Sequence, residues 1–212
     1  MSFHDQIKAN SDAAHAEAEN APFISSLMAG SLTQLSYRDY LAAFLPIYKA
    51  MESLLHERNE SQILGYFNHK ALDRSEFIAH DLATLNAMLG SEFDGTSLNS
   101  VKNYLQRLHS EMSDARLLAH HYIRYLGDLS GGQAISKLVS RHYSISDDAL
   151  TFYNFTNIGD AVYYKKRYRD LLNLAPLTSE EKSEFLDEVS HLYRLSTEIF
   201  IELGLSHSAV AK

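Results

Sequence analysis

The sequence contains no cysteine, and among its 212 residues there are only three prolines and nine glycines. Without cysteine the chain can form no disulfide, no thiolate metal site and no cysteine nucleophile, which suits a reducing compartment. Proline and glycine interrupt regular helices, so their low number permits long helical segments.

The chain also lacks membrane-targeting features and positive net charge. No apolar run reaches the roughly 18 residues that cross a bilayer, and the first residues, MSFHDQIKANSDAAH, lack the apolar core of a signal peptide. The net charge of −8 argues against general nucleic-acid binding and against a polybasic membrane patch. We therefore expect a soluble cytoplasmic protein with no nucleic-acid partner and no membrane anchor.

Apolar residues recur at helical spacing through most of the chain, whereas strand alternation and hairpin turns between apolar runs are missing. The pattern predicts an all-α fold with about seven to eight helices. We expect a single domain over residues 1–212, with a frayed tail at residues 206–212.

The last predicted helix has signals for both of its ends. Its apolar stripe runs from Phe185 to Leu203, and Thr178 with Glu181 fits a capping box before the stripe. Gly204 follows the stripe and would end the helix as a C-terminal cap.

Three glycines interrupt a segment that otherwise reads as one long helix, Leu117–Tyr143. They lie in GDLSGGQ, Gly127–Gln133, and each costs roughly 1 kcal/mol relative to alanine in a helix. Gly127 and Gly131 share a face, which either packs tightly on another helix or bends around a flat ligand. Asp128 favours the ligand slightly, because a carboxylate in an apolar helix is costly unless it is hydrogen-bonded or functional.

Two other protein classes are disfavoured. The letters LSGGQ also spell the signature of ABC-transporter ATPases, but the chain has no Gly-Lys pair for a phosphate-binding loop and no strand–loop–helix alternation. A ferritin-like di-iron protein needs two Glu-x-x-His pairs and two further glutamates, and only Glu188 with His191 fits such a pair.

The first predicted helix offers a candidate metal ligand. Lys8 and His15 are seven residues apart on one face, and Glu19 follows His15 by one helical turn. A carboxylate that takes one ring N–H fixes the imidazole tautomer and leaves the other nitrogen to bind a metal. The alternative is a surface histidine with a helical ion-pair neighbour, which is the commoner reason for such a pair.

His120 and His121 adjoin the glycine segment. Adjacent residues point about 100° apart on a helix, so the two side chains do not easily share one site. We expect one histidine to be structural and the other to face solvent or to cap the helix.

Several segments together resemble the biliverdin-forming heme oxygenases, in order along nearly the whole chain. The matching segments are HAEAEN (His15–Asn20), IYKAMESLL (Ile47–Leu55), HYIRYLGDLSGGQ (His121–Gln133), FYNFTNI (Phe152–Ile158) and KKRYRDLLN (Lys165–Asn173). The resemblance implies that heme b, both cofactor and substrate, lies between the first helix and the kinked glycine-rich helix.

The resemblance also assigns roles on the two faces of the heme. His15 would be the axial iron ligand, with Glu19 as its hydrogen-bond partner. On the opposite face, Gly127 and Gly131 would bring bare backbone close to the macrocycle. Asp128 would order water beside dioxygen, and two further residues match positions of that polar network, Tyr48 and Arg124.

At the rim of the heme, cations and a phenol would bind the two propionates. Four residues match these positions: Lys8, Tyr122, Lys165 and Arg169. The family pattern implies cleavage at the α-meso edge. In KKRYR several cations compete for the last two positions, and by spacing alone this stretch is a solvated basic helix face.

The implied reaction converts heme, O₂ and electrons into biliverdin IXα, CO and ferrous iron, and it would release iron from heme as in the soluble bacterial type. The electron donor would be a ferredoxin or a flavoprotein reductase, and we expect a monomer. A heme carrier on the same scaffold is the alternative, but a carrier has no need of a distal carboxylate such as Asp128.

Overall fold

The computed structural model describes residues 1–210, with side chains through residue 207. Within this range it contains nine α-helices and no strand, which confirms the all-α class and exceeds the expected seven to eight helices. The helices are α1 (Phe3–Glu19), α2 (Pro22–Met28), α3 (Gln34–Glu57), α4 (Ser75–Leu89), α5 (Asn99–Leu108), α6 (Asp114–His121), α7 (Gln133–Tyr143), α8 (Ala161–Leu174) and α9 (Ser179–Val210).

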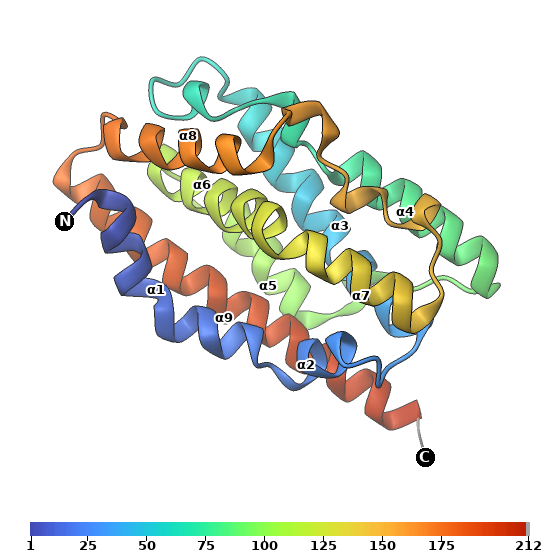
Figure 1. Ribbon diagram of the computed structural model, residues 1–212. Coiled ribbons are helices and arrows are strands. Elements are labelled where there is room, and N and C mark those ends of the chain that lie inside the picture. The colour runs from blue at the N-terminus through green and yellow to red at the C-terminus, as the bar shows by residue number, and fades with distance from the viewer. Residues whose placement is uncertain (211–212) are drawn as a thin grey trace.

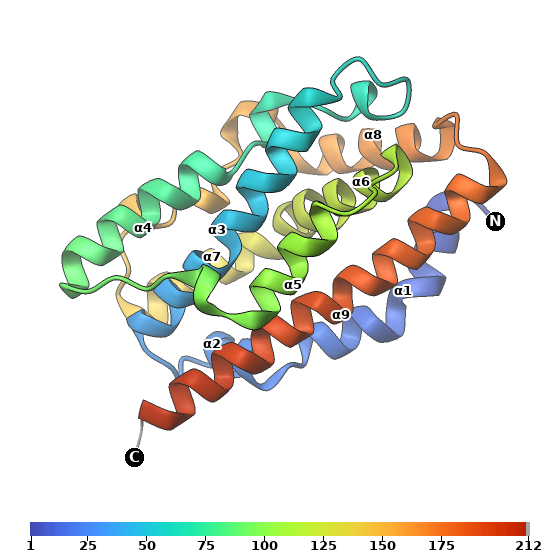
Figure 2. The ribbon, with the colours of Figure 1, turned by 180° about the vertical axis from the view of Figure 1, so that it is seen from behind.

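The long helix α9 organises the molecule. It runs from one end to the other, with α1 and α2 along one side and α5 and α6 packed against it (Figures 1 and 2). Helices α3 and α4 pair on the far side, and α8 packs against α1 near the N-terminus. The segment α6–α7 therefore passes through the middle of the bundle, opposite α1.

The start of α9 follows the sequence signal, but its end does not. The Thr178 N–H donates to Glu181 Oε2 at 2.8 Å, and the Glu181 N–H donates to Thr178 Oγ1 at 3.2 Å, which confirms the capping box. The helix continues through Gly204 to Val210, so the predicted cap was wrong. Gly204 faces Phe23 of α2, whose Cβ would lie 3.7 Å from an added methyl group.

Helix α9 includes residues 206–210, and the predicted frayed tail stays a prediction. Residues 211 and 212 lie outside the described part of the chain.

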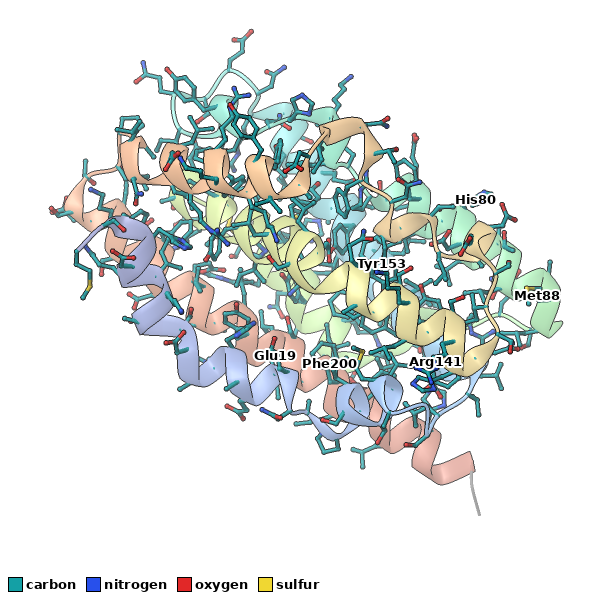
Figure 3. All side chains as sticks on the ribbon, viewed as in Figure 1. Glu19, His80, Met88, Arg141, Tyr153 and Phe200 are labelled. Atoms are coloured by element: carbon teal, nitrogen blue, oxygen red, sulfur yellow. The ribbon has the colours of Figure 1, made fainter. Side chains whose placement is uncertain are left out.

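Helix α1 is amphipathic, with one face buried in the bundle and a neighbouring face available for a binding site. Phe3, Ile7 and Ala18 are buried against the bundle, while Lys8 and His15 stay partly or fully exposed. Figure 3 shows Glu19 towards the C-terminal end of the same helix. Burial of one stripe thus fixes the direction of the other.

Candidate active site

The glycine-rich segment is helical throughout, but it is not one α-helix. Between α6 and α7 the backbone forms two π-helical turns, Tyr122–Leu126 and Asp128–Gly132, on either side of Gly127. A π turn hydrogen-bonds five residues back rather than four, and such turns are frequent at functional sites. The dihedral angles of Gly127, φ −59° and ψ −52°, are open to any residue. Backbone conformation is therefore not why glycine occupies this position.

The surroundings of the glycines separate the two explanations that the sequence left open. A Cβ built on Gly127 or on Gly131 meets no described protein atom within 4 Å, so helix packing does not require glycine there. At Gly132 an added Cβ would lie 2.8 Å from Cδ1 of the buried Tyr153 ring. Tight packing explains Gly132, and open space lies in front of the other two glycines.

A cleft of about 450 Å³ lies between α1 and the π-helical segment, a volume within the range of small-molecule sites. Helix α1 forms one wall, the π-helical segment forms the opposite wall, and α8 and α9 contribute one residue each. The lining residues are His4, Lys8, Ser11, Asp12, His15, Tyr122, Ile123, Leu126, Gly127, Ser130, Arg169 and Tyr193.

His15 projects from the α1 wall with about half of its side chain exposed. Its Nε2 lies 3.3 Å from Glu19 Oε1, so the predicted pair is present. The Tyr193 ring of α9 meets the imidazole edge-to-face, with centroids 5.2 Å apart. The imidazole is thus held by a carboxylate and an aromatic ring while it faces the cleft.

Asp128 of the π-helical segment is hydrogen-bonded to a residue of α3. The Tyr48 hydroxyl donates to Asp128 Oδ2 at 2.6 Å. Burial raises the pKa of the Asp128 carboxyl to about 7, although the Tyr48 hydrogen bond and the charge of Arg124 both favour its ionised form. Arg124 itself donates to Ser196 Oγ at 2.9 Å, and its guanidinium lies over the Phe44 ring.

One end of the cleft is cationic. His4, Lys8 and Arg169 line it, and His4 Nδ1 and Arg169 Nε are buried without a hydrogen-bond partner in the described part of the chain. Burial, followed by the charges of Arg169 and Lys8, lowers the pKa of the His4 imidazole. Unpartnered donors beside fixed cations fit an anionic ligand group.

Five of the eleven predicted site residues line the cleft: Lys8, His15, Tyr122, Gly127 and Arg169. Gly131 is not among the described lining residues. Lys165 is absent from the cleft lining of the described chain, and Arg169, one turn further along α8, takes the place at the cleft. Sequence reasoning missed the other seven lining residues: His4, Ser11, Asp12, Ile123, Leu126, Ser130 and Tyr193. His4 shares the face of Lys8 and was detectable by spacing, whereas Tyr193 lies in the core stripe region of α9 and carried no signal.

We expected one of His120 and His121 to face solvent or to cap the helix, and this expectation was wrong because both side chains are buried. Helix α6 lies inside the bundle, so side chains that point about 100° apart on it both contact protein. His120 Nε2 lies 3.1 Å from Glu188 Oε1. The Tyr168 hydroxyl donates to His121 Nδ1 at 2.7 Å, and His121 Nε2–H donates to the Phe67 carbonyl at 3.1 Å. Burial lowers the pKa of His121 to about 3.

The structure is an all-α bundle in which the helix that bears His15 faces the segment that bears Gly127 across a cleft. The family model described as heme oxygenase matches residues 1–202, and the chain belongs to the heme oxygenase family. It is 32% identical to the heme oxygenase of Rhodella violacea over 204 residues, which cover 94% of this chain and 86% of that protein.

Two solved structures extend the likeness to the fold. The crystal structure of heme oxygenase-1 from the cyanobacterium Synechocystis in complex with heme has a TM-score of 0.90 at 25% identity, covering 100% of this chain and 96% of that one. The structure of heme oxygenase from Leptospira interrogans has a TM-score of 0.86 at 30% identity, covering 94% and 98%. Among residues 1–210, no helix is both long and apolar enough to cross a membrane.

Proposed function

We propose that the cleft binds heme and that the chain cleaves it with O₂ and electrons to biliverdin, CO and ferrous iron. The observation that carries this proposal is the cleft itself, with His15 on one wall and the bare backbone of Gly127 on the other. Bound heme supplies the iron that activates O₂, and its own macrocycle is the substrate. A flat ligand accounts for open space in front of two glycines that packing does not explain.

On the α1 side, His15 would hold the heme iron. Glu19, whose Oε1 lies 3.3 Å from His15 Nε2, would help to hold the imidazole in its orientation. Because the same helix buries Phe3 and Ile7 in the core, the ligand stands on a rigid support.

At the cationic end, Lys8, Arg169 and Tyr122 would bind the propionates, with His4 beside them. Charge-assisted hydrogen bonds from a guanidinium and an ammonium hold carboxylates strongly and directionally. Fixing both propionates fixes the rotation of the macrocycle, which is what selects one meso carbon. We assign the α-meso edge, and hence biliverdin IXα, on the family pattern, and we give Lys165 no direct contact.

On the π-helical side, Asp128 would manage protons through water. A carboxyl whose pKa is about 7 both accepts and releases a proton near neutral pH, which is the property that a general acid–base group needs. Tyr48 holds one carboxylate oxygen in place, and Arg124 supports the ionised form from nearby. Gly127 and Gly131 leave room for O₂ and water beside this carboxyl.

Electrons would come from a ferredoxin or a flavoprotein reductase. We place the docking site of this electron donor on α8, where Lys165 and the exposed Arg167 lie on the same helix as Arg169, which lines the cleft. Cations on an otherwise acidic protein attract a partner with an acidic surface. We further propose that the protein acts as a monomer in the cytoplasm, where a chain without cysteine needs no oxidising environment.

One absorption experiment tests the proposal. One equivalent of hemin is added to the purified protein, and ascorbate is then added in air with catalase present. Loss of the Soret band with growth of a broad red biliverdin absorption is the expected result. A Soret band that persists with ascorbate and with a protein electron donor would instead indicate a heme carrier, and no heme binding would refute the assignment.

A further inference from the structure

Three buried tyrosines form a line that starts at the distal carboxylate. Tyr48, Tyr125 and Tyr168 are 1%, 1% and 2% exposed. The ring centroids of Tyr48 and Tyr125 are 6.3 Å apart, and the His121 ring bridges Tyr125 and Tyr168 at 4.6 and 5.5 Å. Electron transfer slows steeply with distance, so aromatic rings at this spacing form a path for single electrons.

Each of the three phenols also donates a hydrogen bond to a base. The pairs are Tyr48 with Asp128 Oδ2 at 2.6 Å, Tyr125 with Glu52 Oε1 at 3.2 Å, and Tyr168 with His121 Nδ1 at 2.7 Å. A phenol that loses an electron becomes a strong acid and must release its proton. A base already in place lets the electron and the proton leave together, which makes the oxidation reversible.

This pairing is not shared by every buried tyrosine. The Tyr104 hydroxyl has no hydrogen-bond partner among the described residues. The Tyr143 hydroxyl donates at 2.7 Å to the Leu27 carbonyl, which cannot take up a proton. A base at each phenol therefore distinguishes the line from ordinary core packing.

The line connects the candidate active site with the protein surface. At the inner end, Asp128 follows Gly127, which lines the cleft. At the outer end, Tyr168 lines a separate pocket of about 170 Å³ together with Tyr164 and Tyr66, and Tyr66 is 69% exposed. The Tyr122 ring also lines the cleft, and its centroid lies 6.4 Å from that of the Tyr168 ring. Tyr168 can therefore be reached from the cleft through Tyr122 as well as through Tyr48 and Tyr125.

We propose that Tyr48, Tyr125 and Tyr168 form a protective electron relay for heme that a peroxide has oxidised beyond its resting state. The proposal rests on the proposed function, because it requires heme in the cleft. Oxidising equivalents produced beside Asp128 would leave the active site through the relay instead of attacking nearby side chains. The relay ends at the surface pocket, where a one-electron reductant from solution, of the ascorbate class, reaches it.

The steps of the relay balance in electrons and protons. Tyr48 gives one electron to the heme and its proton to Asp128. Tyr125 then gives one electron to Tyr48 and its own proton to Glu52, while Asp128 returns the first proton.

The last tyrosine completes the relay. Tyr168 reduces Tyr125 in the same way, with His121 Nδ1 holding the Tyr168 proton and Glu52 returning the proton of Tyr125. The solution reductant then restores Tyr168, and His121 returns its proton. The net result is one electron transferred from the reductant to the heme, with all three tyrosines unchanged.

The test uses heme-loaded protein, an organic peracid as the two-electron oxidant, rapid freezing and electron paramagnetic resonance. The wild type should give a tyrosyl radical with the signature of a phenol hydrogen-bonded to histidine, and ascorbate should remove it quickly. Tyr168→Phe keeps the ring but lacks the phenol. That variant should lose this radical and retain one on the inner tyrosines that ascorbate removes at least tenfold more slowly.

Two further variants make the result decisive. Tyr143→Phe removes a buried phenol that has no base and should behave like the wild type. Tyr125→Phe breaks the line at its middle and should also lower the Tyr168 radical, which provides a second test if Tyr168→Phe folds poorly. Identical radicals and identical ascorbate kinetics in the wild type, Tyr168→Phe and Tyr125→Phe would overturn the relay.

A Soret titration of the same samples separates the two proposals. Heme binding without any tyrosyl radical overturns the relay alone. Absence of heme binding overturns both the relay and the proposed function.

Discussion

Replacing Gly127 with alanine should make the heme-free protein more stable and the enzyme poorer. The residue has right-handed helical dihedral angles, and an added Cβ meets no described atom within 4 Å. The methyl group is therefore free of strain, and helix propensity favours alanine by about 0.5–1 kcal/mol. For a chain of this size, 1 kcal/mol corresponds to a rise of about 2–4 °C in Tm.

The same methyl group projects into the space that we assign to the macrocycle. Overpacking of a filled site typically costs about 1–3 kcal/mol, and each 1.4 kcal/mol is about tenfold in affinity. We therefore expect heme affinity to fall by about tenfold, with a parallel loss of biliverdin formation. Thermal unfolding of the heme-free protein and a Soret titration measure the two effects separately.

Gly132→Ala is the matched control, five residues further along the same segment. Its Cβ would lie 2.8 Å from the buried Tyr153 ring, so heme-free stability should fall by about 1 kcal/mol or more. If Gly127→Ala lowers the Tm of the heme-free protein as Gly132→Ala does, the open-face argument is refuted. If it leaves heme affinity unchanged, the macrocycle does not lie against Gly127.

Further predictions concern charge. Asp128→Asn should abolish biliverdin formation yet stabilise the heme-free protein at pH 8 by about 1–2 kcal/mol after solvent screening, with little effect at pH 4. The Asp128 pKa, raised to about 7 in the folded protein, lowers the free energy of unfolding progressively as pH rises from about 4, where the unfolded carboxyl ionises, to about 7. His121 is buried in its neutral form, with a pKa of about 3, so the free energy of unfolding should fall by up to about 1.4 kcal/mol for each pH unit below pH 6.5. Urea titrations at several pH values measure this dependence, and His121→Gln should make it weaker. Product analysis should show mixed biliverdin isomers for Arg169→Ala but not for Lys165→Ala.

The sequence alone was sufficient for features that depend on short-range pattern. Helical periodicity predicted the all-α class, and the Thr178–Glu181 capping box formed as its spacing requires. The spacing of Lys8, His15 and Glu19 predicted a shared helix face, because residues one or two turns apart are neighbours whatever the rest of the fold does. The glycine-rich string was also sufficient to indicate the family.

Tertiary structure decided everything that depends on a distant partner. Sequence could not say that Gly132 meets Tyr153 while Gly127 faces open space, because the difference lies in what the fold places opposite each residue. Tyr193 reaches the edge of His15 only because α9 lies beside α1. The raised pKa of Asp128 likewise comes from burial among residues far away in the chain, since desolvation belongs to the assembled site and not to the residue type.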